Sequence, residues 1–466
     1  MGTISPADGP PRQVDRVFDA LVDRIESGAL PVGSKLPSIR AAATSFGVSK
    51  NTAINAYERL VASGRVESRP GSGFYVSGRK PLPPPALQPA AIEAVDSVWL
   101  LREQLERHYE VRVGDGRPPP SWMEGSEVGR HLWGHSGRGR ALQESYGSPF
   151  GYLPLRQALA LTLAERSIRA VADNILLTAG ANHALDLIVR QLVSPEQPVL
   201  VDAPGYYPLF GKLHLARARL VGVRRNEDGP DPEDLAAKIA ATGAKLFFTQ
   251  SLAHNPTGCS ITLPVAHRIL GIAGAAGLQV VESDPFGDVL PAMSPRLAAL
   301  DGLERVIYVG TFAKTLSASL RSGFIAANAA LLGSLLDLKM VTTVNSSGFV
   351  ERALHGLIES GHYRKHLRRL SARIEAAAGQ ARGVLGRLGL PVFGSPAGGF
   401  YIWCELPSGT DLEELSRRAA AESILFAPGT IFSPDGQSAT PTTRLNVAHV
   451  GDPRFEAFMR RELKAP

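Results

Sequence analysis

The sequence contains little cysteine, few aromatic residues and no long apolar run. Cys259 and Cys404 are the only cysteines in 466 residues, too few for a disulfide framework or a structural zinc site. No segment approaches the roughly 20 consecutive apolar residues of a membrane-spanning helix, and no apolar core follows a basic head at the start, as in a secretion signal. With 44% hydrophobic and 20% charged residues, the composition is typical of globular proteins. We therefore expect a reduced, soluble, cytoplasmic protein of more than one domain, without membrane contact.

Positive charge is concentrated near the N-terminus. Residues 28–80 contain eight lysines and arginines but only two acidic residues, so this block accounts for the whole formal net charge of +6. Such a local excess favours a polyanionic partner for one domain. A solvated basic surface without a partner is the alternative on charge alone.

The same region has the pattern of a winged helix. Apolar spacing predicts helices over about 13–27, 38–46 and 49–63, and two short strands over 66–68 and 74–76. Ser38 and Ser49 stand where helix caps are expected, and Gly64 ends the third helix. Three helices followed by a hairpin form a DNA-binding module, which we place at residues 12–77.

Four short motifs in this module resemble the winged-helix domain of GntR-type bacterial regulators. They are Leu36-Pro37-Ser38-x-Arg40, Ser49-Lys50-Asn51-Thr52, Ala56-Tyr57-x-x-Leu60 and Arg69-Pro70-Gly71-Ser72-Gly73-Phe74. The resemblance implies contacts to double-stranded DNA from Arg40, Ser49, Lys50, Asn51, Thr52, Tyr57, Arg69, Gly71 and Gly73.

Elementary chemistry agrees with much of this set. The first turn of a recognition helix reaches base edges, and the Arg40 guanidinium offers paired donors to phosphate or guanine. Gly71 and Gly73 would let the wing backbone approach a minor groove. Ser49 could instead serve only as a helix cap, and the two glycines only as a hairpin turn.

Residues 78–90 contain five prolines, which favour an extended chain over helix or sheet. At about 3.1 Å per residue, this segment could separate two domains by roughly 40 Å. We predict that it is a linker.

Residues 91–466 have the pattern of an α/β fold. Strand-like runs at 198–201, 245–248, 279–281 and 305–308 alternate with helical stretches, which predicts a mostly parallel sheet with helices on both faces. A smaller second lobe is expected over about 350–466.

Separated motifs in this part resemble the fold-type I aminotransferases, which hold pyridoxal 5′-phosphate (PLP). In order they are Thr178-Ala179-Gly180-Ala181-Asn182, Pro204-Gly205-Tyr206, Asn255-Pro256-Thr257-Gly258, Glu282-Ser283-Asp284-Pro285, and Thr311-Phe312-Ala313-Lys314 with Arg321-Ser322-Gly323. The resemblance extends from about Tyr146 to Arg444 and implies a large and a small aminotransferase-like domain.

The resemblance also assigns roles that fit the chemistry of PLP. Lys314 corresponds to the lysine of the Schiff base. The phosphate would be held by the backbone of Gly180, Ala181 and Asn182, by the Thr311 hydroxyl and by Arg321. Asp284 would pair with the pyridine nitrogen, Asn255 would donate to the 3′ oxygen, Tyr206 (or its neighbour Tyr207) would cover the ring, and Arg444 would bind a ligand carboxylate.

One position departs from the family pattern. Many relatives have a tyrosine at the position of Phe286, which has no hydroxyl to donate to the 3′ oxygen. Efficient transamination is therefore less expected than PLP binding. His183, next to the phosphate loop, is expected on a helix surface.

The order of domains resembles the MocR/GabR subfamily of bacterial GntR regulators. It implies a domain-swapped homodimer that reads an operator with two half-sites, in the cytoplasm at the nucleoid. The predicted function is transcription regulation in response to PLP, an amine or an amino acid. Two alternatives are an active aminotransferase with an accessory DNA-binding domain and an architectural DNA binder without cofactor chemistry.

Overall fold

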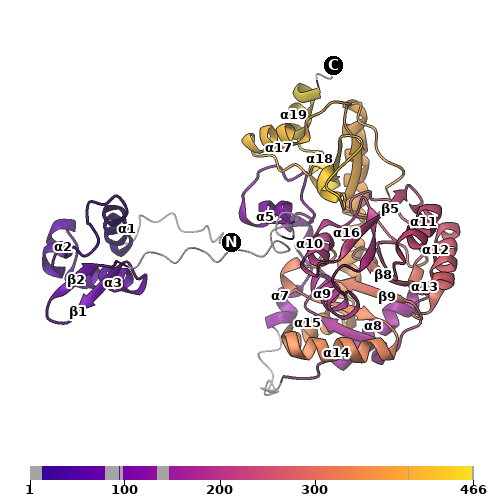
Figure 1. The fold of residues 1–466 in the computed structure, drawn as a ribbon, viewed down its shortest axis with the longest axis horizontal. Helices are drawn as coiled ribbons and strands as arrows, with labels where there is room; N and C mark the ends of the chain where they lie inside the picture. Colours follow the sequence, from indigo (N-terminus) through magenta and orange to yellow (C-terminus); the bar gives the residue numbers. More distant parts are fainter. Residues whose placement is uncertain (1–12, 79–93, 95–97, 134–145, 397, 464–466) are drawn as a thin grey trace. The chain divides into compact units, whose positions relative to one another are not determined.

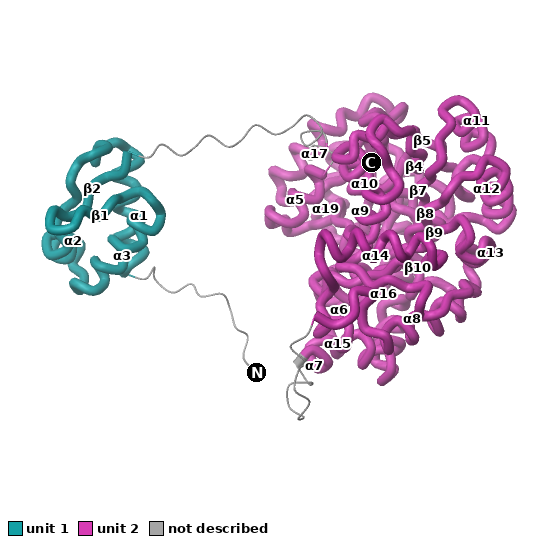
Figure 2. The backbone as a smooth tube through the Cα atoms, turned by 60° about the horizontal axis from the view of Figure 1, so that its bottom comes forward, with its two compact units in different colours: residues 1–86 teal, residues 87–466 magenta. Residues whose placement is uncertain are grey.

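The computed structural model describes residues 13–78, 94, 98–133, 146–396 and 398–463. The chain divides into two compact units, residues 1–86 and 87–466 (Figure 2). The predicted linker spans this division, and its residues 79–90 lie outside the described residues, including Arg79 and Lys80 of the basic block.

The first unit consists of three helices and a hairpin (Figure 1). Its elements are α1 (Gln13–Glu26), α2 (Ile39–Phe46), α3 (Lys50–Ala62), β1 (Val66–Arg69) and β2 (Gly73–Val76). The strands pair antiparallel, with Val66 opposite Val76. The predicted winged-helix layout is confirmed.

Local signals explain these helices. The Ser38 side chain accepts a hydrogen bond from the backbone N–H of Ala41 and caps α2, which ends at Gly47 with a φ of +63°. Val17, Leu21 and Leu60 are fully buried and join α1 to α3 in one apolar cluster. Burial of this cluster, rather than the intrinsic helix propensity of such short segments, stabilises the unit.

The second unit is built on an eight-stranded sheet in the order β3-β10-β9-β8-β7-β4-β5-β6. The strands are β3 (Ile175–Thr178), β4 (Pro198–Ala203), β5 (Arg219–Asn226), β6 (Gly229–Pro230), β7 (Leu246–Thr249), β8 (Gln279–Asp284), β9 (Val306–Thr311) and β10 (Gly323–Ala326). The five strands β9, β8, β7, β4 and β5 run parallel, whereas β10 is antiparallel to both of its neighbours. The sheet is thus mixed but mostly parallel, as predicted.

Helices cover both faces of this sheet. On one face pack α8 (Leu153–Glu165), α11 (Pro232–Thr242), α12 (Leu263–Ala276), α13 (Leu297–Asp301) and α15 (Gly348–Glu359). On the other pack α5 (Trp99–Glu106), α9 (Ala181–Leu192), α10 (Tyr207–Leu215) and α14 (Ala329–Thr343). Short helices α6 (Pro120–Met123) and α7 (Val128–Trp133) and 3-10 turns at Ala172–Asn174, Ala318–Leu320 and Gly429–Phe432 complete the connections.

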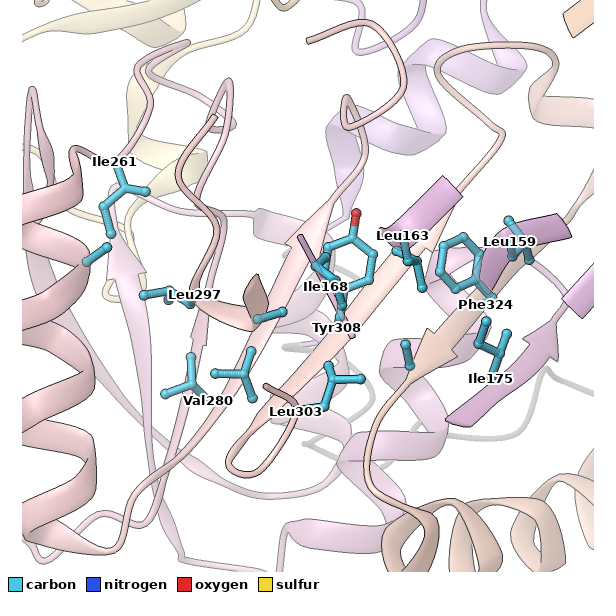
Figure 3. Packing of buried hydrophobic residues seen from close by; sticks show 14 of the residues in the cluster. Leu159, Leu163, Ile168, Ile175, Ile261, Val280, Leu297, Leu303, Tyr308 and Phe324 are labelled. Atoms are coloured by element: carbon cyan, nitrogen blue, oxygen red, sulfur yellow. The ribbon is translucent and has the colours of Figure 1, made fainter. Parts of the chain in front are cut away.

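Side chains of each strand alternate between these two faces, as strand geometry requires. Each face carries one apolar cluster, the first packed under α8 and the second under α9. Val280 of β8 and Tyr308 of β9 belong to the first cluster, whereas Val281 and Val309 belong to the second. Figure 3 shows the first cluster, with Val280, Tyr308 and Phe324 among its labelled residues. We call the face of the sheet that carries the first cluster the α8 face, and the opposite face the α9 face.

A smaller lobe surrounds the antiparallel pair β11 (Tyr401–Glu405) and β12 (Thr442–Asn446). Around it lie α16 (His362–Arg387), α17 (Leu412–Ala421), α18 (Val447–Val450) and α19 (Pro453–Leu463). Its apolar cluster includes Val111 and Val113 from the start of the unit, whereas Leu354 and Leu357 of α15 pack on the α8 face. The lobe boundary at about 350 stays a prediction.

Candidate functional site

The start of α9 forms a recess with Arg321. Gly180, with a φ of +87°, precedes the helix, and a Cβ placed there would stand 3.1 Å from Arg321 Nη2. That nitrogen donates to the Ala179 carbonyl at 3.4 Å. The first N–H groups of a helix have no partner within it and favour anions. A guanidinium beside them suits a phosphate dianion.

Thr311 is the last residue of β9, and Lys314 lies three residues further along the chain. Thr311 is buried, and its hydroxyl donates to the Ser322 carbonyl at 3.3 Å. The Lys314 ammonium donates to the carbonyl of Gly116. Desolvation and the nearby positive charge of Arg444 lower the pKa of Lys314 to about 8. A larger fraction of this amine is therefore neutral, which is the form that acts as a nucleophile.

Arg444 and Asn255 are in direct contact. Arg444 lies on β12 with 1% of its surface exposed, between the rings of Tyr401 and Phe432. Its Nη1 donates to Asn255 Oδ1 at 3.0 Å and its Nη2 to the Gly114 carbonyl at 2.7 Å. Arg444 Nε is buried and has no hydrogen-bond partner among the described residues. Arg444, predicted to bind a ligand carboxylate, and Asn255, predicted to bind the PLP ring, are therefore neighbours in the structure.

Tyr206 lines a cavity on the α9 face, whereas Tyr207 is part of the core. The cavity is also lined by Leu185, Phe248 and Ser283. Tyr207 packs edge-on against Phe432, with ring centroids 5.6 Å apart. Of the two tyrosines that the sequence leaves open, Tyr206 is the one that lines this cavity.

Asp284 does not join these residues. It is 3% exposed, and its Oδ2 accepts hydrogen bonds from Arg296 Nε and Tyr308 Oη, both at 2.8 Å. Tyr308 belongs to the α8 face, and its partner on β8 is Glu282. Asp284 shares that face because it lies two positions after Glu282 on the same strand. The residues of β8 that line the α9-face cavity are Val281 and Ser283. The structure therefore places Asp284 on the opposite side of the sheet from its predicted role.

Two neighbouring residues of the predicted site have structural contacts. Phe286 is fully buried and packs edge-on against Phe400 and Tyr401. His183 is half-buried, and its Nδ1 accepts a hydrogen bond from the Ala179 N–H at 3.1 Å, so that it closes the turn before α9 instead of lying free on a helix surface.

Four residues in this region are missing from the predicted site: Gly114, Gly116, Tyr401 and Ser283. Gly114 and Gly116 contribute carbonyl oxygens, and the Tyr401 hydroxyl donates to the Gly116 carbonyl at 3.0 Å. Backbone carbonyls have no sequence signature, so these glycines gave no signal. Ser283 could have been found, because alternation along β8 separates it from Asp284.

In the first unit, Arg40, Lys50 and Asn51 are exposed, the last two in the first turn of α3. Among the described residues, neither Arg40 nor Lys50 has a recorded ion pair, whereas Arg59 pairs with Asp15 at 2.6 Å. The Ser49 hydroxyl accepts from the Thr52 N–H at 3.1 Å and contacts the Thr52 hydroxyl at 2.8 Å. Ser49 is thus a helix cap, whether or not it also contacts DNA.

Tyr57 lies in the core of the first unit. It is fully buried, its hydroxyl donates to the Pro37 carbonyl at 2.8 Å, and its ring packs edge-on against Phe74. Burial raises the pKa of Tyr57 to about 12. The predicted DNA contact is therefore replaced by a packing role.

The wing has the predicted turn. Gly71 and Gly73 have φ values of +73° and +114°, which glycine adopts without strain. Arg69 is exposed, pairs with Glu67 and lies over the Tyr75 ring at 4.3 Å. Contact with DNA would require Arg69 to exchange this intramolecular partner.

Comparison with known families agrees with both units. Residues 115–461 match the family described as aminotransferase class I and II, and residues 13–76 match the bacterial regulatory proteins of the gntR family. The chain therefore belongs to the class I and II aminotransferase family, with a GntR-family domain at its N-terminal side. This fusion is the arrangement of MocR-type proteins, as the resemblance predicted.

Three known proteins illustrate the two halves. The uncharacterized HTH-type transcriptional regulator YisV of Bacillus subtilis (strain 168) is 28% identical over 442 residues, which cover 91% of this chain and 90% of that protein. The 2-aminoadipate transaminase of Thermus thermophilus is 31% identical over 314 residues, covering 65% and 76%. The crystal structure of LysN, the alpha-aminoadipate aminotransferase of that organism in complex with N-(5′-phosphopyridoxyl)-L-leucine, matches at a TM-score of 0.72 with 27% identity, covering 81% of this chain and 97% of that chain.

The fold implies PLP as the cofactor. Within the described ranges, no helix has the length and apolar character needed to cross a membrane. In that same part of the chain, no group of three or more His, Cys, Asp or Glu side chains is arranged to hold a metal ion.

Proposed function

We propose that this protein is a DNA-binding transcription regulator whose aminotransferase-like unit binds PLP and senses an amine, an amino acid or PLP itself. One observation supports this most strongly: a single chain joins an exposed basic turn at Lys50 to a unit in which Lys314, Asn255 and Arg444 converge. A plain transaminase has no use for the first feature.

The described residues suit PLP at its phosphate and aldehyde ends. Gly180, Ala181 and Asn182 would hold the phosphate through their backbone, together with Thr311 and Arg321. The absence of a side chain at Gly180 supports this placement, because a Cβ there would stand only 3.1 Å from the Arg321 guanidinium. When bound, the cofactor supplies an aldehyde that reacts with amines. Lys314 would be the amine for this position, since it lies within reach of Gly116 beside Arg444 and its pKa of about 8 leaves more of the amine neutral than the ordinary 10.5 does.

The ligand is proposed to contain a carboxylate as well as an amine. Arg444 is desolvated, and its Nε has no partner among the described residues, so a carboxylate would satisfy it. Asn255 orients the guanidinium through the 3.0 Å hydrogen bond and would also face the 3′ oxygen. Tyr206 would cover the ring.

The first unit is proposed to read double-stranded DNA in the bacterial cytoplasm, at the nucleoid. Lys50, Asn51 and Thr52 would reach base edges, and Arg40 would bind phosphate or guanine. Ser49 would position this turn as its cap, while Gly71 and Gly73 would shape the wing with Arg69. A domain-swapped homodimer would present two such units to an operator with two half-sites.

Footprinting on the DNA upstream of the gene tests this function. We expect two protected half-sites in wild type, a change in their occupancy when PLP or one of a panel of amino acids is added, and a dimer in sedimentation. Arg40→Ala should lose protection and keep PLP, whereas Lys314→Ala should keep protection and lose the ligand response. Rapid turnover of an amino acid with no effect on DNA binding would instead favour the aminotransferase alternative.

A further inference from the structure

On β8, Ser283 and Val281 line the cavity on the α9 face, and Ser283 is the polar one of the two. In the parallel pairing of β8 with β9, Ser283 lies opposite Val309, and Asp284 lies opposite Gly310. Val309 belongs to the α9 face, and Thr311, two residues further along β9, projects the same way. Ser283 thus shares a face with Thr311 and a cavity with Tyr206.

Three carboxylates of the second unit that could be considered for this role already have cationic partners. Asp202 lines the cavity, but its Oδ2 accepts from Arg225 Nη1 at 3.1 Å and from the Thr249 hydroxyl at 2.9 Å. Asp115, whose charge acts on Lys314, is bonded to two arginines at 2.8 and 2.9 Å. Asp284 is bonded to Arg296 on the α8 face.

A serine and a carboxylate have different effects on a pyridine nitrogen. An aspartate stabilises the protonated, positively charged ring, and PLP enzymes use Asp or Arg as partners of this nitrogen. A hydroxyl is neutral and can donate its hydrogen to an unprotonated nitrogen. Without a positive ring, the cofactor is a weaker electron sink.

We infer that Ser283, and no carboxylate, meets the pyridine nitrogen of PLP in this chain, so that the ring nitrogen stays unprotonated. This inference rests on the proposed function, because it assumes PLP in the site. It also gives that function a chemical basis. The aldehyde can still join an amine at Lys314, but the proton abstraction that transamination requires is poorly supported, so the site responds to a ligand without consuming it.

Phe286 has a consistent effect at the other side of the ring. A buried phenylalanine that packs against Phe400 and Tyr401 cannot donate to the 3′ oxygen. Ser283 therefore supplies no negative charge to the ring nitrogen and Phe286 supplies no donor to the 3′ oxygen. Lys314 and Arg321 retain the groups that would bind the cofactor.

Nitrogen NMR on the full chain, loaded with PLP labelled with 15N in its ring, tests the inference. We expect wild type and Ser283→Ala to show the downfield resonance of an unprotonated pyridine, and Ser283→Asp to show the large upfield shift of a pyridinium. Asp284→Asn is the matched control. It is needed because Asp284 Oδ1 has no hydrogen-bond partner among the described residues and is therefore the alternative partner for the ring nitrogen. It should leave the wild-type resonance unmoved.

The outcomes separate the two proposals. Failure of wild type to take up PLP would overturn the proposed cofactor site. Uptake with a pyridinium resonance in wild type would overturn only the role of Ser283, and loss of that resonance in Asp284→Asn would assign it to Asp284. The wild-type spectrum alone decides the inference if a variant fails to fold.

Discussion

The Tyr308 hydroxyl donates a 2.8 Å hydrogen bond to the Asp284 carboxylate, on the α8 face of the large sheet. Arg296 completes the arrangement with a salt bridge of 2.8 Å in which both side chains are at most 1% exposed. Burial and the negative charge of Asp284 raise the pKa of Tyr308 well above its ordinary value, which keeps the hydroxyl protonated as a donor. The contact thus holds β8 and β9 together from the side away from Tyr206.

Asp284→Asn is expected to destabilise the protein by about 3 kcal/mol, because it leaves the buried Arg296 charge without a counter-ion. Urea unfolding of the full chain measures this effect. Glu233→Gln, which removes an exposed ion pair with Arg268, is the control and should cost less than about 1 kcal/mol. Unchanged stability together with a loss of PLP would show that Asp284 is a cofactor residue after all.

Lys314→Ala should abolish the visible absorbance of protein-bound PLP, because no other described lysine lies among the proposed cofactor residues. Absorbance spectroscopy after gel filtration gives the readout. DNA binding by the first unit should be retained. Lys245→Ala, which removes an exposed lysine bonded to the Ala276 carbonyl, serves as the control and should keep the absorbance. Retention of the visible band in Lys314→Ala would rule out this lysine.

The rate of PLP uptake by apo-protein should rise with pH and level off above about 8, the pKa of Lys314, which lies below the ordinary 10.5. Only the neutral amine reacts, so each pH unit below the midpoint should slow uptake about tenfold. Arg444→Gln removes a nearby cation and should move the midpoint to higher pH. Arg382→Gln, which removes an exposed arginine, is the control and should leave the midpoint unchanged. A midpoint that stays fixed in Arg444→Gln would show that another group controls the rate.

Arg40→Ala and Lys50→Ala should each weaken binding to a random-sequence duplex at low salt about tenfold and reduce the salt dependence by roughly one released ion. Fluorescence anisotropy over a series of salt concentrations measures both quantities. Arg65→Ala is the comparison, because Arg65 is paired with Glu26 at 3.1 Å. Equal losses in all three variants would indicate a diffuse charge effect rather than a DNA-binding face.

The sequence predicted the fold in more detail than the site. Caps such as Ser38 and Ser49, and apolar periodicity in α1 and α3, are local signals that the structure reproduces. The motif alone did not give the face on which Asp284 lies, because a shift of one residue along a strand moves a side chain to the other face. The alternation of side chains along β8 was the signal that separates Asp284 from Ser283. The predicted DNA contact of Tyr57 was wrong for a related reason. A motif identifies a residue but does not show whether its side chain packs in the core or binds a partner.

The carbonyls of Gly114 and Gly116 lie on the segment between α5 and α6, in the first part of the second unit. Gly114 accepts a hydrogen bond from Arg444, and Gly116 accepts hydrogen bonds from Lys314 and Tyr401. A ligand that draws Arg444 or Lys314 to itself would take a hydrogen bond away from this segment. Ligand binding and the anchoring of the main chain at Gly114 and Gly116 are therefore coupled through the same hydrogen bonds.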